Sequence, residues 1–297
     1  MKRFFTPLCV LLLMLASFTA GMEYPRGDVD QNGDVNIGDV VTLIDYLLTG
    51  NWPAESEDPT VTFDVNGVLF KMIAVDGGTF EMGATMEQGY GAYDWEKPVH
   101  QVTLSDYFIG QTEVTQELWI AVMGNDPSYY NDNPLLPVDN VSWNDCQIFI
   151  SKLNEMTGQS FRLPTEAEWE FAARGGNLSE GFRYSGEDDI DLIGWYWGNI
   201  PSHYSGTTGY GTQPVATKLP NELGLYDMTG NVWEWCQDWY GSYSWEDQTD
   251  PTGPSWGSYR IFRGGSWSRS AESCRVSYRN FNYPSSSDDS MGFRLAL

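Results

Sequence analysis

The chain has 297 residues, of which 41% are hydrophobic and 15% aromatic, and 16 Lys and Arg against 41 Asp and Glu give a net charge of −25. This hydrophobic content can bury a large core, which excludes a disordered chain, and four cysteines are too few for a disulfide scaffold. Because phosphates attract clustered Lys and Arg, so acidic a chain is not expected to bind nucleic acid.

The first residues have the pattern of a secretory signal peptide. Lys2 and Arg3 precede an apolar stretch over 8–16, and small residues follow at 19–21. The stretch is shorter than the ~20 apolar residues that span a membrane, and no other segment could form a span. We therefore expect residues 1–21 to be removed and the mature protein to be secreted, periplasmic or located at the cell surface.

Residues 22–50 are expected to form a small calcium-binding loop followed by a helix. Oxygen-bearing side chains stand at the ligand positions of a twelve-residue calcium loop, and Gly33 stands where such a loop reverses. The candidate ligands are Asp28, Asp30, Asn32, Asp34, Asn36 and Asp39. The alternative is an acidic surface turn without metal. An acidic linker with two prolines follows over 51–60.

This loop departs from the EF-hand pattern at its last position, where Asp39 replaces the usual Glu. In this respect it resembles the calcium repeat of dockerin domains. A full dockerin has two such repeats and only one is found here, so docking to a cohesin-like partner is not expected.

The rest of the chain, 61–297, is predicted to be one α+β domain that is low in regular secondary structure. Alternating segments typical of strands lie at 61–65, 70–75 and 100–104. Helices are predicted over 115–123, over 143–156 between a Ser142 cap and a Gly158 stop, and from Thr165 onward. After Gly175 the sequence is mostly Gly-, Ser- and Trp-rich loop with isolated strands, so we expect aromatic packing and bound ions to hold the domain together.

Eight separated motifs occur in order along this domain. They lie at 77–83, 98–102, 113–115, 141–145, 162–170, 224–235, 263–267 and 292–294. Among them are Arg-Leu-Pro-Thr-Glu-Ala-Glu-Trp-Glu, Gly-Asn-Val-Trp-Glu-Trp and Arg-Gly-Gly-Ser-Trp. Together they resemble the sulfatase-modifying-factor family, to which the formylglycine-generating enzyme belongs, over about residues 68–297. The resemblance implies the formylglycine-generating-enzyme fold, which is C-type-lectin-like.

The resemblance also implies a redox centre, which this chain keeps only in part. The family's oxidase converts a cysteine of a target sulfatase to formylglycine, using oxygen and a Cu(I) ion held by two thiolates. The second thiolate matches Cys274, and the first matches Arg269, which has no lone pair for a metal and stays charged. Ser266 and Trp233 would line the substrate groove. Copper is therefore not expected, and catalysis is expected to be absent or impaired.

Two further features follow from the resemblance. A second calcium site would use Asp227, Gly230, Val232 and Glu234, for which the alternative is a capped turn with Glu234 in a salt bridge. The segments that carry Cys236 and Cys274 are neighbours in the family fold, so a disulfide between them is a hypothesis. The third mature cysteine, Cys146, falls on the apolar stripe of a predicted helix and is expected to be a buried thiol.

Two functions remain open. The first is a secreted oxidase that acts on sulfatase-like targets. The second is a calcium-stabilised, non-catalytic module that binds a peptide or glycan in a C-terminal groove formed by 266–289. This segment is dense in Ser, Asn, Tyr and Arg, which give adaptable hydrogen bonds and rigid aromatic contact, although an ordinary solvated loop is the alternative. The residue at position 269 discriminates between the two functions.

Overall fold

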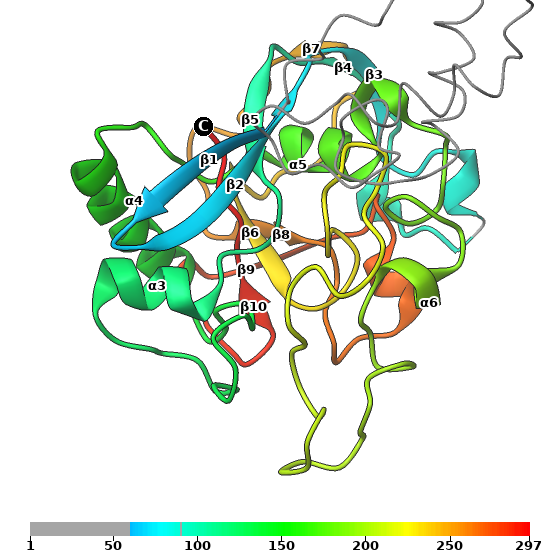
Figure 1. Cartoon of the computed structure of the whole chain (residues 1–297). Coiled ribbons are helices and arrows are strands. Elements are labelled where there is room, and N and C mark those ends of the chain that lie inside the picture. Colours follow the sequence, from blue (N-terminus) through cyan, green and yellow to red (C-terminus); the bar gives the residue numbers. More distant parts are fainter. Residues whose placement is uncertain (1–59, 90) are drawn as a thin grey trace, which may run out of the picture. The chain divides into compact units, whose positions relative to one another are not determined.

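A computed structural model describes residues 60–89 and 91–297 (Figure 1). The expected signal peptide, the calcium loop with its six candidate ligands, and linker residues 51–59 lie outside the described residues. Thr60, the last residue of the expected linker, is the first residue of a strand. In the described ranges no helix is both long enough and apolar enough to cross a membrane.

The described part begins with an antiparallel hairpin of β1 (Thr60–Val65) and β2 (Val68–Val75). Asn66 and Gly67 connect the strands, and both have positive φ, as a two-residue hairpin turn requires. Strand β5 (Tyr107–Gly110) pairs with β2 and completes a three-stranded sheet. The strands expected at 61–65 and 70–75 are confirmed. Figure 1 shows the hairpin lying beside α3 and α4.

Local sequence signals place the helices α3 (Gln116–Met123), α4 (Trp143–Thr157) and α5 (Glu166–Ala173). Each begins after a cap whose side-chain oxygen accepts a backbone N–H three residues on, namely Thr115, Ser142 and Thr165. Helix α4 ends at Gly158 in the left-handed conformation. All three predicted helices are confirmed. The remaining helical turns are α6 (Ile190–Ile193), η1 (Met86–Gln88), η2 (Asp94–Glu96), η3 (Gly176–Leu178) and η4 (Ala271–Cys274).

The strands after residue 175 are not isolated, contrary to the expectation from the sequence, because most of them form one sheet. Its order is β10-β6-β8-β9, made of β10 (Met291–Gly292), β6 (Trp233–Trp239), β8 (Arg260–Arg263) and β9 (Arg279–Asn282). A third sheet has the order β3-β4-β7, made of β3 (Thr79–Met82), β4 (His100–Thr103) and β7 (Gln248–Thr249). The strand expected at 100–104 is thus confirmed.

Aromatic packing fills the interior, as predicted. The Trp119 and Phe149 rings stack with centroids 5.1 Å apart, and Phe293 packs edge-on against Phe149 at 5.3 Å. Cys146 lies in the same cluster and is fully buried, in agreement with its predicted place on the helix stripe. The core therefore joins α3, α4 and the final segment of the chain.

Buried arginines form a second layer of interactions that the sequence did not reveal. Arg263, Arg275, Arg279 and Arg294 are at most 2% exposed. Each is paired with glutamate side chains from distant segments, among them Glu170, Glu96, Glu166 and Glu234. Burial of so many charges is tolerated because each guanidinium is paired and hydrogen-bonded.

The last residues of the chain are hydrogen-bonded into the middle of the domain. Leu297 and Phe108 exchange two backbone hydrogen bonds, of 2.9 and 3.1 Å. Ala296 and Arg162 exchange two more, of 2.8 and 2.9 Å. Through these bonds the final segment connects β5 with Arg162, which lies shortly before α5.

Candidate functional site

The segment expected to carry the redox centre is a turn followed by η4. Arg269 is exposed, and its guanidinium makes no ion pair or hydrogen bond with another described residue, while its backbone oxygen accepts from Trp197 N at 2.9 Å. Cys274 is fully buried, and its thiol donates to the Ser270 carbonyl at 3.6 Å. Burial raises the pKa of Cys274 to about 12, so the thiol is protonated at neutral pH.

The two other residues expected in this groove are also buried. Ser266 is 0% exposed, and its hydroxyl lies 3.2 Å from the hydroxyl of Ser268. Trp233 is 2% exposed and packs against Phe262 and Tyr278, with ring centroids 5.0 and 5.9 Å away. Both therefore support the floor of the segment, and neither presents its side chain to solvent.

Several aromatic residues lie in the neighbourhood of Arg269, since Trp197 N donates to its carbonyl and its charge acts on Tyr278. We call the set of Arg269, Tyr93, Trp95, Trp197 and Tyr278 the Arg269 surface. The Tyr93 and Trp95 rings are stacked with centroids 4.3 Å apart and are 43% and 42% exposed. Tyr278 packs edge-on against Tyr93 at 5.8 Å. Burial raises the pKa of Tyr278, and the nearby Arg269 charge offsets part of that rise.

The residues expected to bind a second calcium lie around the start of β6, where Glu234 forms a salt bridge. Its Oε2 accepts from Arg294 Nε at 2.6 Å and from Trp169 Nε1 at 2.7 Å. Its Oε1 accepts from Arg294 Nη2 at 2.7 Å. The carboxylate is thus neutralised by a guanidinium, which was the alternative considered for this residue.

Asp227 is the other acidic residue of that set, and only one of its two carboxylate oxygens is hydrogen-bonded. Its Oδ2 accepts from Ala216 N at 2.7 Å, whereas its buried Oδ1 has no hydrogen-bond partner. Burial raises the pKa of Asp227 to about 6. Nearby Glu113 also has a pKa well above its ordinary value, because of burial and the charges of Asp227 and Glu234.

The donor set therefore fits calcium poorly as it stands. Within residues 60–89 and 91–297, no group of three or more His, Cys, Asp or Glu side chains is arranged to hold a metal ion. With Glu234 paired to Arg294, the acidic oxygen left without a partner is Asp227 Oδ1. A second calcium at Asp227, Gly230, Val232 and Glu234 stays a prediction.

Cys146, Cys236 and Cys274 are all buried free thiols in the structure. Cys236 lies in the cluster around Trp169 and Phe171, and Cys274 lies in a separate cluster with Tyr184 and Ile190. The hypothesised Cys236–Cys274 disulfide is not formed here. Burial raises the pKa of both Cys236 and Cys274, so each thiol is protonated and a poor nucleophile at neutral pH.

Comparison with known proteins resolves the family of the main domain. The family model for the sulfatase-modifying factor enzyme 1-like domain matches residues 62–297. The chain belongs to this family. It is 33% identical over 308 residues to the formylglycine-generating enzyme of Thermomonospora curvata, covering 80% of this chain and 98% of that one.

Solved structures agree with the family assignment. Treponema denticola variable protein 1 is similar with a TM-score of 0.70 and 34% identity, covering 80% of this chain and 98% of that one. PvdO from Pseudomonas aeruginosa has a TM-score of 0.65 and 25% identity, covering 81% and 99%. The mixed helix-and-sheet fold with little regular structure is therefore confirmed, whereas its C-type-lectin-like character stays a prediction.

The dockerin type I domain model matches residues 26–67, which confirms the dockerin-like resemblance and implies that this part of the chain binds calcium. The match runs into β1, which the structure pairs with β2 of the main domain. The two family matches thus overlap over residues 62–67.

Within the sulfatase-modifying-factor domain, the Arg269 and Cys274 pair does not fit the copper centre that the family implies. A Cu(I) ion needs soft donors, but one position holds a guanidinium directed to solvent and the other a buried, protonated thiol. Arg269 is instead an exposed cation whose charge acts on the nearby Tyr278 hydroxyl.

Both glycines of the family's Gly-Gly-Ser turn have positive φ, and the second also has no room for a Cβ. Gly265 has φ +80°, and a Cβ there would lie 2.9 Å from the Cα of Cys274. We expect Gly265→Ala to lower the free energy of unfolding by about 2–4 kcal/mol, measured by urea denaturation. Gly124→Ala is the matched control, because Gly124 has φ +82° but open space around it, and it should cost about 1 kcal/mol. Equal losses in the two variants would contradict the close approach of Gly265 to Cys274.

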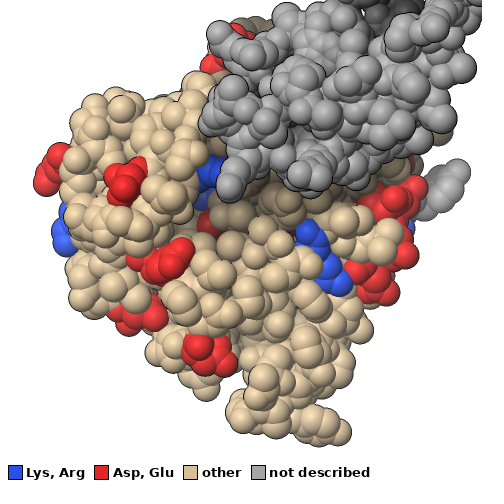
Figure 2. All heavy atoms as spheres, in the orientation of Figure 1, with Lys and Arg blue, Asp and Glu red and all other residues tan. Residues whose placement is uncertain are grey.

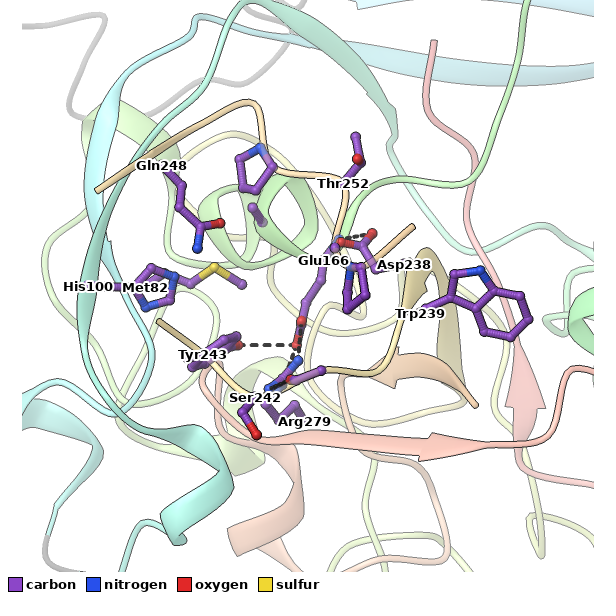
Figure 3. A pocket seen from close by; sticks show the side chains of 15 residues that line it. Met82, His100, Glu166, Asp238, Trp239, Ser242, Tyr243, Gln248, Thr252 and Arg279 are labelled. Atoms are coloured by element: carbon purple, nitrogen blue, oxygen red, sulfur yellow. Dashed lines mark hydrogen bonds and ion pairs between the residues drawn. The ribbon is translucent and has the colours of Figure 1, made fainter. Parts of the chain in front are cut away.

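Sequence reasoning missed a cavity of about 310 Å³ formed by β4, the start of α5, the end of β6 and the segment after it (Figure 3). Its wall includes His100, Glu166, Asp238, Tyr243 and Arg279. The sequence feature that could have indicated it is the density of Gly, Pro and Trp after residue 240. Such a composition is also typical of an ordinary loop, and it does not show which residues pack beneath it.

Proposed function

We propose that this chain is a non-oxidising member of the family, which binds a polypeptide segment at the Arg269 surface. The observation that carries the proposal is an exposed, unpaired guanidinium where the family's oxidases have a copper-binding cysteine. The remaining thiol, Cys274, is buried. Loss of the thiol pair removes the oxidation step but leaves the surface on which such enzymes hold their target.

The side chains of the Arg269 surface suit recognition of a peptide. Tyr93 and Trp95 offer a stacked pair of half-exposed rings, and Trp197 is 44% exposed. Rigid aromatic rings supply contact area at low entropic cost, and a free guanidinium can bind a carboxylate or a backbone carbonyl. A glycan at the same surface is the alternative, and relatives that generate formylglycine favour the peptide.

The test is to incubate the purified chain with Cu(I), oxygen and a Cys-x-Pro-x-Arg peptide. We expect no mass loss in the peptide, because the thiol-to-aldehyde conversion needs both sulfur ligands. We expect the peptide to bind, and Arg269→Ala to weaken binding by about tenfold as one charge-assisted contact is lost. Arg269→Cys, which rebuilds the thiol pair, is the variant expected to gain Cu(I). Turnover by the unmodified chain would overturn the proposal.

Residues 26–67 support two further parts of the proposed function. The dockerin type I match favours a cohesin as the partner of this part of the chain, although the sequence showed a single calcium loop. Dockerins and their partners work outside the cell, so we propose that the protein is exported and that the N-terminal segment serves as its signal peptide. A sulfatase-like protein is the natural candidate for the polypeptide that meets the Arg269 surface.

A further inference from the structure

Two tryptophans between β6 and β8 are almost fully exposed. The exposed fraction is 83% for Trp245 and 80% for Trp256, whereas Trp169 and Trp235 are fully buried. Both exposed tryptophans belong to residues 240–259, which we call the β6–β8 segment. An exposed tryptophan leaves a large apolar ring in contact with water instead of in the core. Two such residues on one segment therefore indicate a site that contacts a ligand or partner.

The same segment bounds the cavity seen in Figure 3. Tyr243 and Pro254 both line it, and each stands two residues from one of the exposed tryptophans. At about 310 Å³ the cavity is in the size range of small-molecule sites. The tryptophans thus stand in the chain directly beside the residues that form its wall.

Hydrogen-bonding groups in the wall are free to meet a ligand. The side chains of Ser242, Gln248 and Thr252 line the cavity and make no hydrogen bond to another described residue. In Figure 3, Gln248 and His100 lie on one side of the cavity, and Asp238 and Trp239 lie on the other. A ligand in this space would meet hydroxyl and amide groups from opposite sides.

The charges in the wall are already paired. Arg279 binds Glu166 through Nε–Oε1 and Nη2–Oε2 contacts of 2.7 and 2.5 Å, and Tyr243 donates to the same carboxylate at 3.2 Å. Burial, followed by the charge of Glu166, raises the pKa of Asp238 to about 8, so this carboxyl is largely neutral at pH 7. The cavity therefore offers neither a free cation for an anionic ligand nor a free anion for a cationic one.

The acidity of the whole chain points the same way. With a net charge of −25, the protein repels polyanions at long range. Figure 2 shows acidic side chains at several separate places on the face drawn, with fewer basic ones between them. The field thus disfavours an anionic ligand, while the free hydrogen-bonding groups of the wall are uncharged hydroxyls and an amide.

The β6–β8 segment is held in place before any ligand arrives. Asp250 accepts from both Ser105 N and Ser105 Oγ at 2.8 Å, and its own N–H donates to Thr103 at 2.9 Å. Gln248 is part of β7, which pairs in parallel with β4. Gly253 packs so closely on Asp238 that a Cβ there would lie 3.0 Å from the Asp238 Cβ. Binding would therefore cost little ordering of the chain.

We propose that this cavity, with Trp245 and Trp256, binds a neutral oligosaccharide. A sugar ring carries C–H groups on its faces and hydroxyls around its edge, so one sugar unit can meet Ser242, Gln248 and Thr252 while neighbouring units stack on the indoles. Stacking on exposed rings and hydrogen bonds to uncharged groups is the combination that such a ligand requires. None of these residues belongs to the Arg269 surface, although Arg279 of the cavity wall donates to the Trp95 carbonyl at 3.4 Å. Separate variants therefore test the two sites.

The test is to titrate the full chain with cellohexaose, xylohexaose, mannohexaose and maltohexaose by calorimetry and by tryptophan fluorescence. At least one of these neutral sugars should bind and shift the emission of the exposed tryptophans to shorter wavelength. Trp245→Ala/Trp256→Ala should weaken that binding by about tenfold or more and remove the spectral shift. Gln248→Ala should weaken it without removing the shift.

Two control variants test whether sugar binding belongs to this cavity and its two tryptophans. Tyr204→Ala removes an equally exposed aromatic side chain outside the segment, since Tyr204 is 78% exposed, and should leave sugar binding unchanged. Arg269→Ala should also leave it unchanged, so a failure of the peptide proposal is seen separately. Absence of binding by all four sugars at millimolar concentration, or equal affinity in the double tryptophan variant, would overturn the proposal.

Discussion

Arg294→Met is expected to destabilise the domain by about 3–5 kcal/mol, the largest effect we predict for a single substitution. Arg294 and Glu234 are both 0% exposed, and two contacts of 2.6 and 2.7 Å join them. Arg294 also donates to the carbonyls of Gly110 and Tyr226 at 2.9 Å. Methionine fills a similar volume but leaves a buried carboxylate without its cation. Urea denaturation at pH 7 measures the loss.

A second variant separates the charge effect from the packing effect. Glu234→Gln/Arg294→Met removes the uncompensated charge and should recover part of the stability. Lys97→Met is the matched surface control, because the pair of Lys97 and Asp94 is exposed and 3.6 Å apart, and it should change stability by about 0.5 kcal/mol or less. A loss below about 1 kcal/mol in Arg294→Met would contradict the central role of this ion pair.

Asp238→Asn should change how stability depends on pH. Burial and the Glu166 charge raise the pKa of Asp238 from its ordinary 3.8 to about 8 in the folded protein. Between these values the folded state holds a proton that the unfolded state has released, so the free energy of unfolding falls as pH rises from 4 to 8. For this group the slope reaches about 1.4 kcal/mol per pH unit.

The asparagine variant lacks this titration while its amide oxygen can still accept from Glu166 N, as Asp238 Oδ2 does at 2.9 Å. The stability of Asp238→Asn relative to the unmodified chain should therefore increase steadily from pH 5 to pH 8. Urea denaturation at several pH values gives the difference. Asp132→Asn, at an exposed position, serves as the control, and parallel curves for the chain and Asp238→Asn would disprove the shift.

The features that the sequence predicted well are local ones. Thr115, Ser142 and Thr165 begin α3, α4 and α5 as expected, because a capping side chain acts on a backbone N–H three residues away. Asn66 and Gly67 also form a local turn, but their hairpin was not among the predictions. The motifs identified the family because eight of them occur in the same order along the chain. They also showed that Arg269 stands where the family has a cysteine.

The features that the sequence did not predict depend on distant partners. Glu234 was weighed as a calcium ligand or a salt-bridge residue, and its partner lies 60 residues away in the chain. Strands β8 and β9 are four residues each and acquire their register only by pairing. The cavity wall combines His100, Glu166 and Asp238 from three elements, and no spacing in the sequence brings them together. Long-range pairing of this kind leaves no periodic signal.

The hydrogen bonds of Leu297 and Ala296 with Phe108 and Arg162 have a consequence for the order of folding. Phe108 and Leu297 lie far apart in the chain, and bringing distant segments together costs more loop-closure entropy than local pairing, so these bonds are expected to form late in folding. Until they form, β5 pairs with β2 alone, and its other edge is open to pairing with another chain.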